Sequence, residues 1–331
     1  MNDVSFVIVC YNHARYADRV ARFLRAQEGI DDAEYIFVDD GSTDGTAEAI
    51  ARATEGWRNT RIHRQANMGP SNALNQGIRR ATRPFIKLVV GDDLLHPRAT
   101  VMLRDRLVAR DAVYAFGRLG AFDPGIAADD TEYWSRLMPP VGALSDTPID
   151  DPLAFMIRNM SHNPSCIMVR AADARAAGGS DESVFIEDYS LSLRMALRGG
   201  FVHLPVEIAF APEGDEQRLS IDGAQTLHDV NWALAGLVRD HPELPWRIRS
   251  RIARRAAGRG WHWARRKGGE RMFSRIWLLS MLGHLRLLPP SSSIMEAACQ
   301  LFRATRVIRL PGRRTAPPMD GKRDNPGHVR R

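Results

Sequence analysis

Two adjacent aspartates, Asp92 and Asp93, directly follow an apolar run and could hold a divalent metal ion. The run covers residues 84–90 and stops at Gly91, which predicts a buried strand with carboxylates at its carboxyl end. Open α/β sheets bind ligands at that end of their strands. Mg²⁺ and Mn²⁺ prefer oxygen ligands, and Mg²⁺ commonly takes one or two carboxylates together with water and phosphate oxygens. The alternative is that both aspartates are turn residues capping a helix that Pro97 opens.

Two further polar loops follow apolar runs earlier in the chain. Residues 11–13 (Tyr-Asn-His) follow the run at 5–10, and residues 39–46 follow the run at 35–38. Because the carboxyl ends of parallel strands meet at one edge of a sheet, both loops are expected to converge with residues 91–93. The loops contain neither G-x-G-x-x-G nor G-K-[ST]. The sequence therefore predicts a crevice that binds a nucleotide through carboxylates and a metal.

Helical patterns alternate with these strands and define the fold class. The helices are expected after residue 16, after Thr46 and over residues 73–81, and a further strand is expected around residues 61–63. Strands that alternate with helices indicate an α/β fold with a largely parallel sheet covered by helices on both faces.

Four spaced motifs resemble family 2 glycosyltransferases of the GT-A fold. They are the strand and turn at residues 5–12, the loop at 38–46, Asn67-Met68-Gly69, and Gly91-Asp92-Asp93. The resemblance implies a GT-A Rossmann-like sandwich with a mostly parallel central sheet over residues 1–225. It also implies an inverting transfer of sugar from a nucleoside diphosphate sugar.

The same resemblance assigns roles to single residues. Asp39 is expected to hold a uracil or thymine base, Asp92 to contact the sugar nucleotide, and Asp93 to ligate Mg²⁺ or Mn²⁺ bound to the diphosphate. Five more residues are expected to belong to the nucleotide-sugar site: Cys10, Tyr11, Asn12, Asp40 and Gly69.

A second pair of acids, Glu187 and Asp188, opens a predicted helix. Acids at a helix start commonly complement the helix dipole, which is the structural alternative for this pair. Residues 187–194 are, however, similar to the family's E-D-x-x-L-x-x-R acceptor-side motif. The resemblance implies that Asp188 is the general base, and motif grounds favour Glu187 for orienting the acceptor.

Some positions depart from the family pattern. Leu74 stands where many relatives carry Arg or Lys, and Ser180 stands where many carry an aromatic residue. The family's next acceptor-side loop has Arg218 as its best candidate for a diphosphate contact, with a solvated surface arginine as the alternative.

Two rival functions share parts of this pattern. A sugar-1-phosphate nucleotidyltransferase has a similar core but typically carries a glycine-rich basic loop after its first strand, where this chain has residues 11–14, Tyr-Asn-His-Ala. A non-catalytic binding protein could keep the fold, but retention of Asp39, Asp92, Asp93 and Asp188 together argues against it.

Composition places the protein in the cytoplasm. The three cysteines, Cys10, Cys166 and Cys299, are too few and scattered for a disulfide framework or a zinc site. The first residues show no basic leader segment, and the apolar stretch at 276–288 is too short to span a bilayer. We therefore expect a cytoplasmic protein, peripheral on the inner face of the membrane.

Charge is divided unevenly along the chain. Residues 240–331 contain 21 Lys and Arg against 6 Asp and Glu, which is +15, so the net charge of +7 leaves −8 for residues 1–239. Helical patterns continue over residues 226–310, and Trp261 and Trp263 lie among their cations. Such helices suit an anionic membrane surface, where each cation contributes ~1 kcal/mol.

Packing of these helices on the catalytic domain, with a solvated basic face, fits the same pattern. No recognisable nucleic-acid fold accompanies the charge, so nucleic acid is not expected as a partner. The expected partners are a nucleotide-sugar donor and a glycan or lipid-linked acceptor, as in surface polysaccharide assembly. Residues 311–331, rich in Arg, Pro and Gly, are predicted to be disordered.

Overall fold

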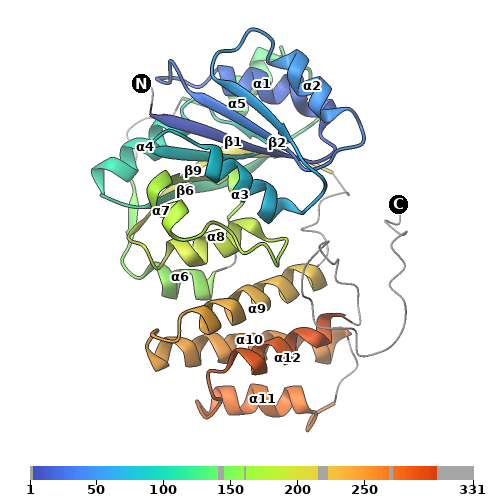
Figure 1. Cartoon of the computed structure of the whole chain (residues 1–331), viewed down its shortest axis with the longest axis vertical. Coiled ribbons are helices and arrows are strands. Elements are labelled where there is room, and N and C mark those ends of the chain that lie inside the picture. The colour runs from blue at the N-terminus through green and yellow to red at the C-terminus, as the bar shows by residue number, and fades with distance from the viewer. Residues whose placement is uncertain (1–2, 141–144, 160–161, 215–222, 268–270, 304–331) are drawn as a thin grey trace.

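The computed structural model describes residues 3–140, 145–159, 162–214, 223–267 and 271–303 (Figure 1). The strands are β1 Val4–Cys10, β2 Glu34–Asp39, β3 Thr60–Arg64, β4 Phe85–Val90, β5 Leu94–Leu95, β6 Tyr114–Phe122, β7 Thr147–Ile149, β8 Ile167–Arg170 and β9 Phe201–Pro212. The helices of the first 200 residues are α1 Ala17–Arg25, α2 Thr46–Ala53, α3 Pro70–Arg80, α4 Ala99–Ala109, α5 Thr131–Leu137, α6 Pro152–Arg158, α7 Ala171–Ala176 and α8 Glu187–Met195, with short 3₁₀ turns η1 Ala14–Tyr16 and η2 Pro164–Cys166. The C-terminal helices are α9 Gly223–Asp240, α10 Trp246–Lys267, α11 Arg275–His284 and α12 Ser292–Arg303.

One sheet forms the centre of the molecule, in the order β3-β2-β1-β4-β8-β6-β9-β5, with β7 also paired to β9. Strands β1, β2, β3 and β4 are parallel neighbours, and β6 and β9 run in the same direction as these four. Strands β8, β5 and β7 run in the opposite direction. The expected α/β fold with a mostly parallel sheet is confirmed.

Helices cover both faces of this sheet because side chains alternate between the faces along each strand. On β1, Val7 joins one core with α3, α8 and the C-terminal helices, whereas Phe6 and Ile8 join the other core with α1 and α4. Strand β1 is buried on both faces, as the continuous apolar run at residues 5–10 predicts for a central parallel strand.

Strand β6 was not predicted, because residues 111–160 carry loop signals at 123–125 (Asp-Pro-Gly), 129–130 (Asp-Asp) and 138–140 (Met-Pro-Pro). The strand itself contains two glycines, Gly117 and Gly120. A Cβ atom at Gly117 would lie 2.6 Å from the side chain of Ile208, and one at Gly120 would lie 2.6 Å from that of Phe210. The glycines are therefore needed because side chains of β9 cover the β6 backbone.

The C-terminal helices pack against the sheet-bearing part of the chain. Ile252, Ala253, Ala256 and Ala257 of α10 are buried in the same core as Val7. Helices α9, α10 and α12 lie below α6 and α8 in Figure 1, and α11 forms the outermost layer. Packing, one of the two alternatives for this basic region, is thus observed for one face of α10. The predicted disorder at 311–331 lies outside the described residues.

None of the helices in the described part of the chain combines the length and the apolar content needed to cross a bilayer.

Candidate functional site

The carboxyl ends of β1, β2 and β4 lie side by side. Cys10 at the end of β1 is in register with Asp39 at the end of β2, and Val9 is in register with Val90 of β4. The loops that begin at Tyr11, Asp40 and Gly91 therefore leave the same edge of the sheet. The convergence predicted for these three loops follows directly from this register.

The loop after β1 is held against the loop after β2. Asn12 has a left-handed backbone (φ 57°), which asparagine tolerates better than most residues. Its amide donates to Ser42 Oγ at 2.8 Å, and its Oδ1 accepts from the Thr43 amide at 2.9 Å. The His13 amide donates to Thr46 Oγ1 at 2.9 Å. Asn12 thus joins two walls of the site, while the neighbouring Tyr11 ring is exposed.

Asp39 lies fully buried at the end of β2. Its Oδ1 accepts from the Ser42 amide at 3.0 Å and from the Ser42 hydroxyl. Its Oδ2 forms an ion pair with Arg64 Nε at 3.4 Å. The chain fixes this carboxylate from one side, so its orientation is set before any ligand binds.

Asp40 has a different role. Its carboxylate accepts from the amides of Met68 and Gly69 and from Gln65 Nε2, each at 2.8 Å. Burial raises the pKa of Asp40, and these hydrogen bonds partly oppose that rise. Asp40 therefore holds the turn before α3, and Gly69 lies in this turn with a left-handed φ of 88°. Both residues were predicted to belong to the nucleotide-sugar site, and this stays a prediction.

Gly91 lets the loop after β4 approach the loop after β1. A Cβ atom there would lie 2.5 Å from Cys10 Sγ and 2.7 Å from His13 Nδ1. Burial raises the pKa of the Cys10 thiol, and the charges of Asp39 and Asp92 raise it further. Cys10 is consequently a buried neutral thiol between the two carboxylates, which suits packing better than direct contact with a donor.

Asp92 and Asp93 are both almost completely buried, and Asp93 is held by a residue that sequence reasoning missed. Ser165 Oγ donates to Asp93 Oδ2 at 2.7 Å and accepts from the Val90 amide at 2.9 Å. The Lys87 ammonium donates to the carbonyl oxygens of Leu88 at 3.0 Å and of Ser165. Burial lowers the pKa of Lys87 to about 7, although Cys166 and Asp93 oppose that shift.

The second acid pair lies at the start of α8, close to the strand ends. Burial raises the pKa of the Cys166 thiol to about 12, Lys87 opposes this rise, and the charges of Asp93 and Asp188 add to it. The pKa of the Cys166 thiol is therefore affected by both Asp93 and Asp188, although these two residues are 95 positions apart in the sequence. Both acids lie in the first turn of α8, as the helix-dipole alternative requires, and Asp188 Oδ1 accepts from the Tyr189 amide at 2.7 Å.

Burial raises the pKa of Glu187 well above its usual range, and the neighbouring Asp188 charge raises it further. A carboxyl with a raised pKa keeps its proton more readily and can donate a hydrogen bond, whereas an ionised carboxylate can accept a proton. Glu187 is therefore suited to donate a hydrogen bond.

The raised pKa gives a prediction for Glu187→Gln. The Glu187 carboxyl binds its proton more tightly in the folded than in the unfolded chain, so its contribution to stability is present at low pH. That contribution is lost as the pH rises through the raised pKa. The variant should therefore gain stability over wild type as the pH rises from acidic to neutral. Thermal unfolding from pH 4 to 8 measures this, and parallel curves for both proteins would contradict it.

The loop before α8 is fixed to α3 by Asn75. Its amide nitrogen donates to Ser180 O at 2.9 Å and to Glu182 Oε1 at 3.1 Å, while its Oδ1 accepts from the Ser180 amide at 2.8 Å. Gly179 has a left-handed φ of 66°, and a Cβ atom there would overlap Asn75 Oδ1. The Gly178-Gly179 pair therefore serves to place α8.

The C-terminal helices contact the same loop and α8. Asp229 Oδ2 on α9 accepts from the Phe185 amide at 2.7 Å, and Trp232 Nε1 donates to Ser183 Oγ at 3.0 Å. Arg259 of α10 donates to Asn231 Oδ1 of α9 at 3.1 Å and lies close enough to the buried Tyr189 of α8 to lower its pKa against the rise that burial causes. Arg259, one cation of the basic region, thus packs close to the helix that carries Asp188.

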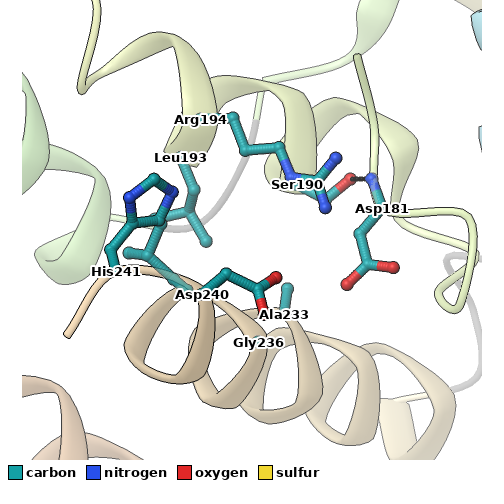
Figure 2. A pocket seen from close by; sticks show the side chains of 9 residues that line it. Asp181, Ser190, Leu193, Arg194, Ala233, Gly236, Asp240 and His241 are labelled. Carbon is teal, nitrogen blue, oxygen red and sulfur yellow. Dashed lines mark hydrogen bonds between the residues drawn. The ribbon is translucent and has the colours of Figure 1, made fainter. Parts of the chain in front are cut away.

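A small cavity lies between α8 and α9 (Figure 2). Asp181, Ser190 and Arg194 line one wall, and Asp240 and His241 line the other. Asp39, Asp92 and Asp93 do not line this cavity, so we interpret it as a gap in the packing of α8 on α9 and not as part of the candidate site.

The described residues contain no group of three or more His, Cys, Asp and Glu side chains able to hold a metal ion. The pair Asp92 and Asp93 can offer one or two carboxylates, which is the number that Mg²⁺ commonly takes from a protein when phosphates complete its shell. Carboxylates this deeply buried are normally paired or bound to a cation. The donor set therefore fits a hard divalent ion that arrives with a phosphorylated ligand.

The model of glycosyl transferase family 2 matches residues 5–142, the segment that includes the loops after β1, β2 and β4. This segment is a family 2 glycosyl transferase domain. The resemblance that the spaced motifs indicate is confirmed.

Relatives of the family 2 domain cover only part of the chain. Poly-beta-1,6-N-acetyl-D-glucosamine synthase of Staphylococcus aureus is 30% identical over 95 residues, which are 29% of this chain and 23% of that protein. An uncharacterized glycosyltransferase of Nostoc is 31% identical over 121 residues, or 36% and 37% of the two chains. The chain thus matches about a quarter to a third of these relatives' lengths.

Solved structures share the fold over most of the chain. The crystal structure of S. aureus TarS 1-349 has a TM-score of 0.58 at 15% identity and covers 92% of this chain and 87% of that one. The mannosyltransferase PcManGT of Pyrobaculum calidifontis, in complex with GDP-Man and Mn²⁺, has a TM-score of 0.53 at 16% identity and covers 92% and 87%. These likenesses confirm the GT-A type of fold.

The structure explains the two positions, Leu74 and Ser180, that depart from the family pattern. Leu74 is buried in the core beneath α3, so this position packs rather than faces the crevice. Ser180 is also buried, and its hydroxyl donates to Glu187 O at 2.7 Å. Arg218, the candidate for a diphosphate contact, lies outside the described residues.

Proposed function

We propose that this protein is an inverting, metal-dependent glycosyltransferase that moves a sugar from a UDP or dTDP sugar to an acceptor hydroxyl. The observation that carries this proposal is the convergence of the loops that hold Asp39, Asp92 and Asp93 on one sheet edge. The charges of Asp93 and Asp188 both raise the pKa of the Cys166 thiol, which supports a position of Asp188 close to this edge. Membership of residues 5–142 in family 2 supports it.

The donor side of the proposed site is formed by the first three loops. The buried Asp39 carboxylate accepts hydrogen bonds and is suited to the N–H of a pyrimidine base. Asp92 follows β4 at the same sheet edge, and its charge, like that of Asp39, raises the pKa of the Cys10 thiol, so we assign Asp92 to the ribose or sugar. TarS has been crystallised with UDP-GlcNAc and PcManGT with GDP-Man, which supports a nucleotide sugar as the donor class.

Asp93 is the proposed protein ligand of Mg²⁺ or Mn²⁺. A bound divalent ion would neutralise charge on the leaving diphosphate and act as a Lewis acid. Ser165 fixes the Asp93 carboxylate through Oδ2, in the manner of outer hydrogen bonds that orient metal ligands.

Asp188 is the proposed general base. It would remove the proton of the acceptor hydroxyl as that oxygen attacks the sugar C1 from the face opposite the diphosphate. The protonated Glu187 carboxyl beside it would donate a hydrogen bond and orient the acceptor. The loop contacts of Asn75 and Asp229 keep both acids in place.

We infer that the acceptor is a glycan or a lipid-linked glycan, used in surface polysaccharide assembly at the inner face of the cytoplasmic membrane. The printed name of the Staphylococcus relative, a poly-N-acetylglucosamine synthase, supports a polysaccharide context. The basic C-terminal helices support attachment to an anionic surface.

Ser165→Ala tests the metal assignment without removing a ligand. Loss of the hydrogen bond to Asp93 should weaken Mn²⁺-dependent donor binding roughly 10- to 100-fold. The Val90 amide also loses its acceptor, which should cost about 1–3 kcal/mol of stability. A Mn²⁺ titration of donor binding and urea unfolding measure the two effects. Ser135→Ala, on exposed α5, is the control, and an unchanged titration for Ser165→Ala would contradict the assignment.

Hydrolysis of the donor tests the reaction class most simply. Purified protein with Mn²⁺ should slowly release sugar and nucleoside diphosphate from one nucleotide sugar, because water can replace the acceptor. Release of pyrophosphate from a nucleoside triphosphate and a sugar phosphate would instead identify a nucleotidyltransferase.

A further inference from the structure

Helix α11 is apolar on both sides, although only one side is covered by the described residues. Ile276, Ser280 and Gly283, at three- and four-residue spacing, are buried against α10 and α12. A Cβ atom on Gly283 would lie 3.3 Å from Arg254 Cα, so the two helices approach closely at this point. A helix that is apolar all round is normally buried all round.

The opposite side of α11 carries a row of exposed apolar side chains. Leu278, Met281 and Leu285 follow the same helical spacing on the outer side and are 51%, 38% and 62% exposed. Met272, Phe273 and Leu287, at the two ends of the helix, are 65%, 80% and 66% exposed. These six residues form what we call the α11 face.

No comparable group occurs elsewhere in the described parts of the chain. The remaining exposed large apolar side chains there are scattered over the first 246 residues: Tyr11, Ile62, Val108, Leu119 and Trp246. Single exposed apolar side chains are ordinary, but a contiguous group commonly marks an interaction surface. Phe273 also has a left-handed backbone (φ 71°), which a bulky residue seldom adopts.

Exposed cations lie on and next to α11 in the sequence. Residues 265–287 contain six Lys and Arg and one acidic residue. All six cations are exposed: Arg265, Arg266, Lys267, Arg271, Arg275 and Arg286. Apolar side chains next to cations match the layered chemistry of a bilayer surface, in which anionic headgroups lie above acyl chains.

We propose that the α11 face inserts into the surface of an anionic lipid bilayer, with these cations at the level of the headgroups. The surface charge complements anionic lipid, and the ten residues of α11 are too few to cross a membrane. The helix therefore lies in the plane of the membrane. This places the membrane contact on α11, whereas the sequence pattern had pointed to α10, one face of which is buried.

The attachment would hold the protein at the membrane that carries a lipid-linked acceptor. Helix α11 packs on α10, and α10 contacts Tyr189 in the helix that carries Asp188. This consequence for the acceptor rests on the proposed sugar transfer, whereas the lipid contact does not.

Vesicle co-sedimentation of the full chain, without nucleotide sugar, tests the proposal. Wild-type protein should sediment with phosphatidylcholine vesicles that contain about 30% phosphatidylglycerol, and far less with phosphatidylcholine alone. The triple variant Leu278→Gln, Met281→Gln, Leu285→Gln should lose at least roughly tenfold in partitioning, because it removes apolar area without adding charge. The double variant Val108→Gln, Leu119→Gln is the matched control and should bind as wild type.

Three results would overturn the proposal: no sedimentation of wild type with anionic vesicles, equal sedimentation with neutral vesicles, or wild-type binding by the triple variant. Light scattering after gel filtration supplies a fourth: a wild-type dimer that the triple variant converts to a monomer would identify a second copy of the chain as the occupant of the α11 face. Thermal unfolding of the triple variant should match wild type, because the replaced side chains are exposed. Failure of sugar transfer would leave all these outcomes unchanged.

Discussion

Asp188→Asn is expected to abolish most sugar transfer while leaving donor binding intact. Asparagine has nearly the same shape as aspartate but cannot take up the acceptor proton, and loss of a general base typically costs roughly 10²- to 10⁴-fold in rate. Donor affinity should change little, because Asp188 lies on α8 and the proposed donor contacts lie on the loops after β1, β2 and β4. Turnover with saturating donor and a separate donor titration measure the two effects.

Two further variants make the role of Asp188 specific. Glu187→Gln should weaken binding of the acceptor but leaves the proposed general base, Asp188, in place. Its KM for the acceptor should therefore rise more than its kcat falls. Asp129→Asn, in an exposed loop before α5, should leave both constants unchanged. Wild-type turnover by Asp188→Asn would remove this residue from the role of base.

Asp93→Ala is expected to abolish the dependence of donor binding on Mn²⁺. The variant loses the proposed ligand itself, so the effect should exceed the roughly 10- to 100-fold expected for loss of an outer hydrogen bond in Ser165→Ala. Isothermal titration of the donor with and without Mn²⁺ measures it.

The stability of Asp93→Ala must be examined alongside binding. The replacement removes a buried carboxylate and leaves the Ser165 hydroxyl without its acceptor, so thermal unfolding is needed to show that the chain is folded. Glu55→Gln, at an exposed position after α2, controls for loss of a negative charge. A folded Asp93→Ala protein with the wild-type Mn²⁺ titration would contradict the metal assignment.

The convergence of the loops after β1, β2 and β4 could be predicted because each strand and the loop after it are consecutive in the sequence. Apolar runs ending in polar loops at Cys10, Asp39 and Gly91 indicate parallel strands, and strand register alone brings their ends together. The same patterns could not show that Asn12 and Asp40 serve loop structure, since Asn12 binds residues about 30 positions away and Asp40 binds the turn before α3.

The supporting residues could not be predicted because their partners are distant in the sequence. Ser165 and Asp93 are 72 positions apart, and Asn75 and Ser180 are 105 apart. No local pattern marks either contact. Strand β6 was missed for a related reason, because its glycines meet side chains of β9 that are about 90 positions away.

The basic C-terminal region shows a third kind of limit. The number of its cations can be counted from the sequence, but helical spacing alone could not show which helix has an exposed apolar side. The burial of side chains distinguishes α10 from α11. One face of α10 is buried in the core and its Arg259 lies close to Tyr189, whereas the outer side of α11 carries a row of exposed apolar side chains.

The central claim is that the strand-end carboxylates bind a nucleoside diphosphate sugar together with a divalent metal. A thermal-shift screen of nucleotide sugars with and without Mn²⁺ tests it most directly. A donor at about 100 times its Kd stabilises the folded chain by about 2.7 kcal/mol, so one uridine or thymidine diphosphate sugar should raise Tm by roughly 5 °C or more in Mn²⁺ and far less without it. Equal melting temperatures with every nucleotide sugar, in the presence and absence of Mn²⁺, would contradict the account.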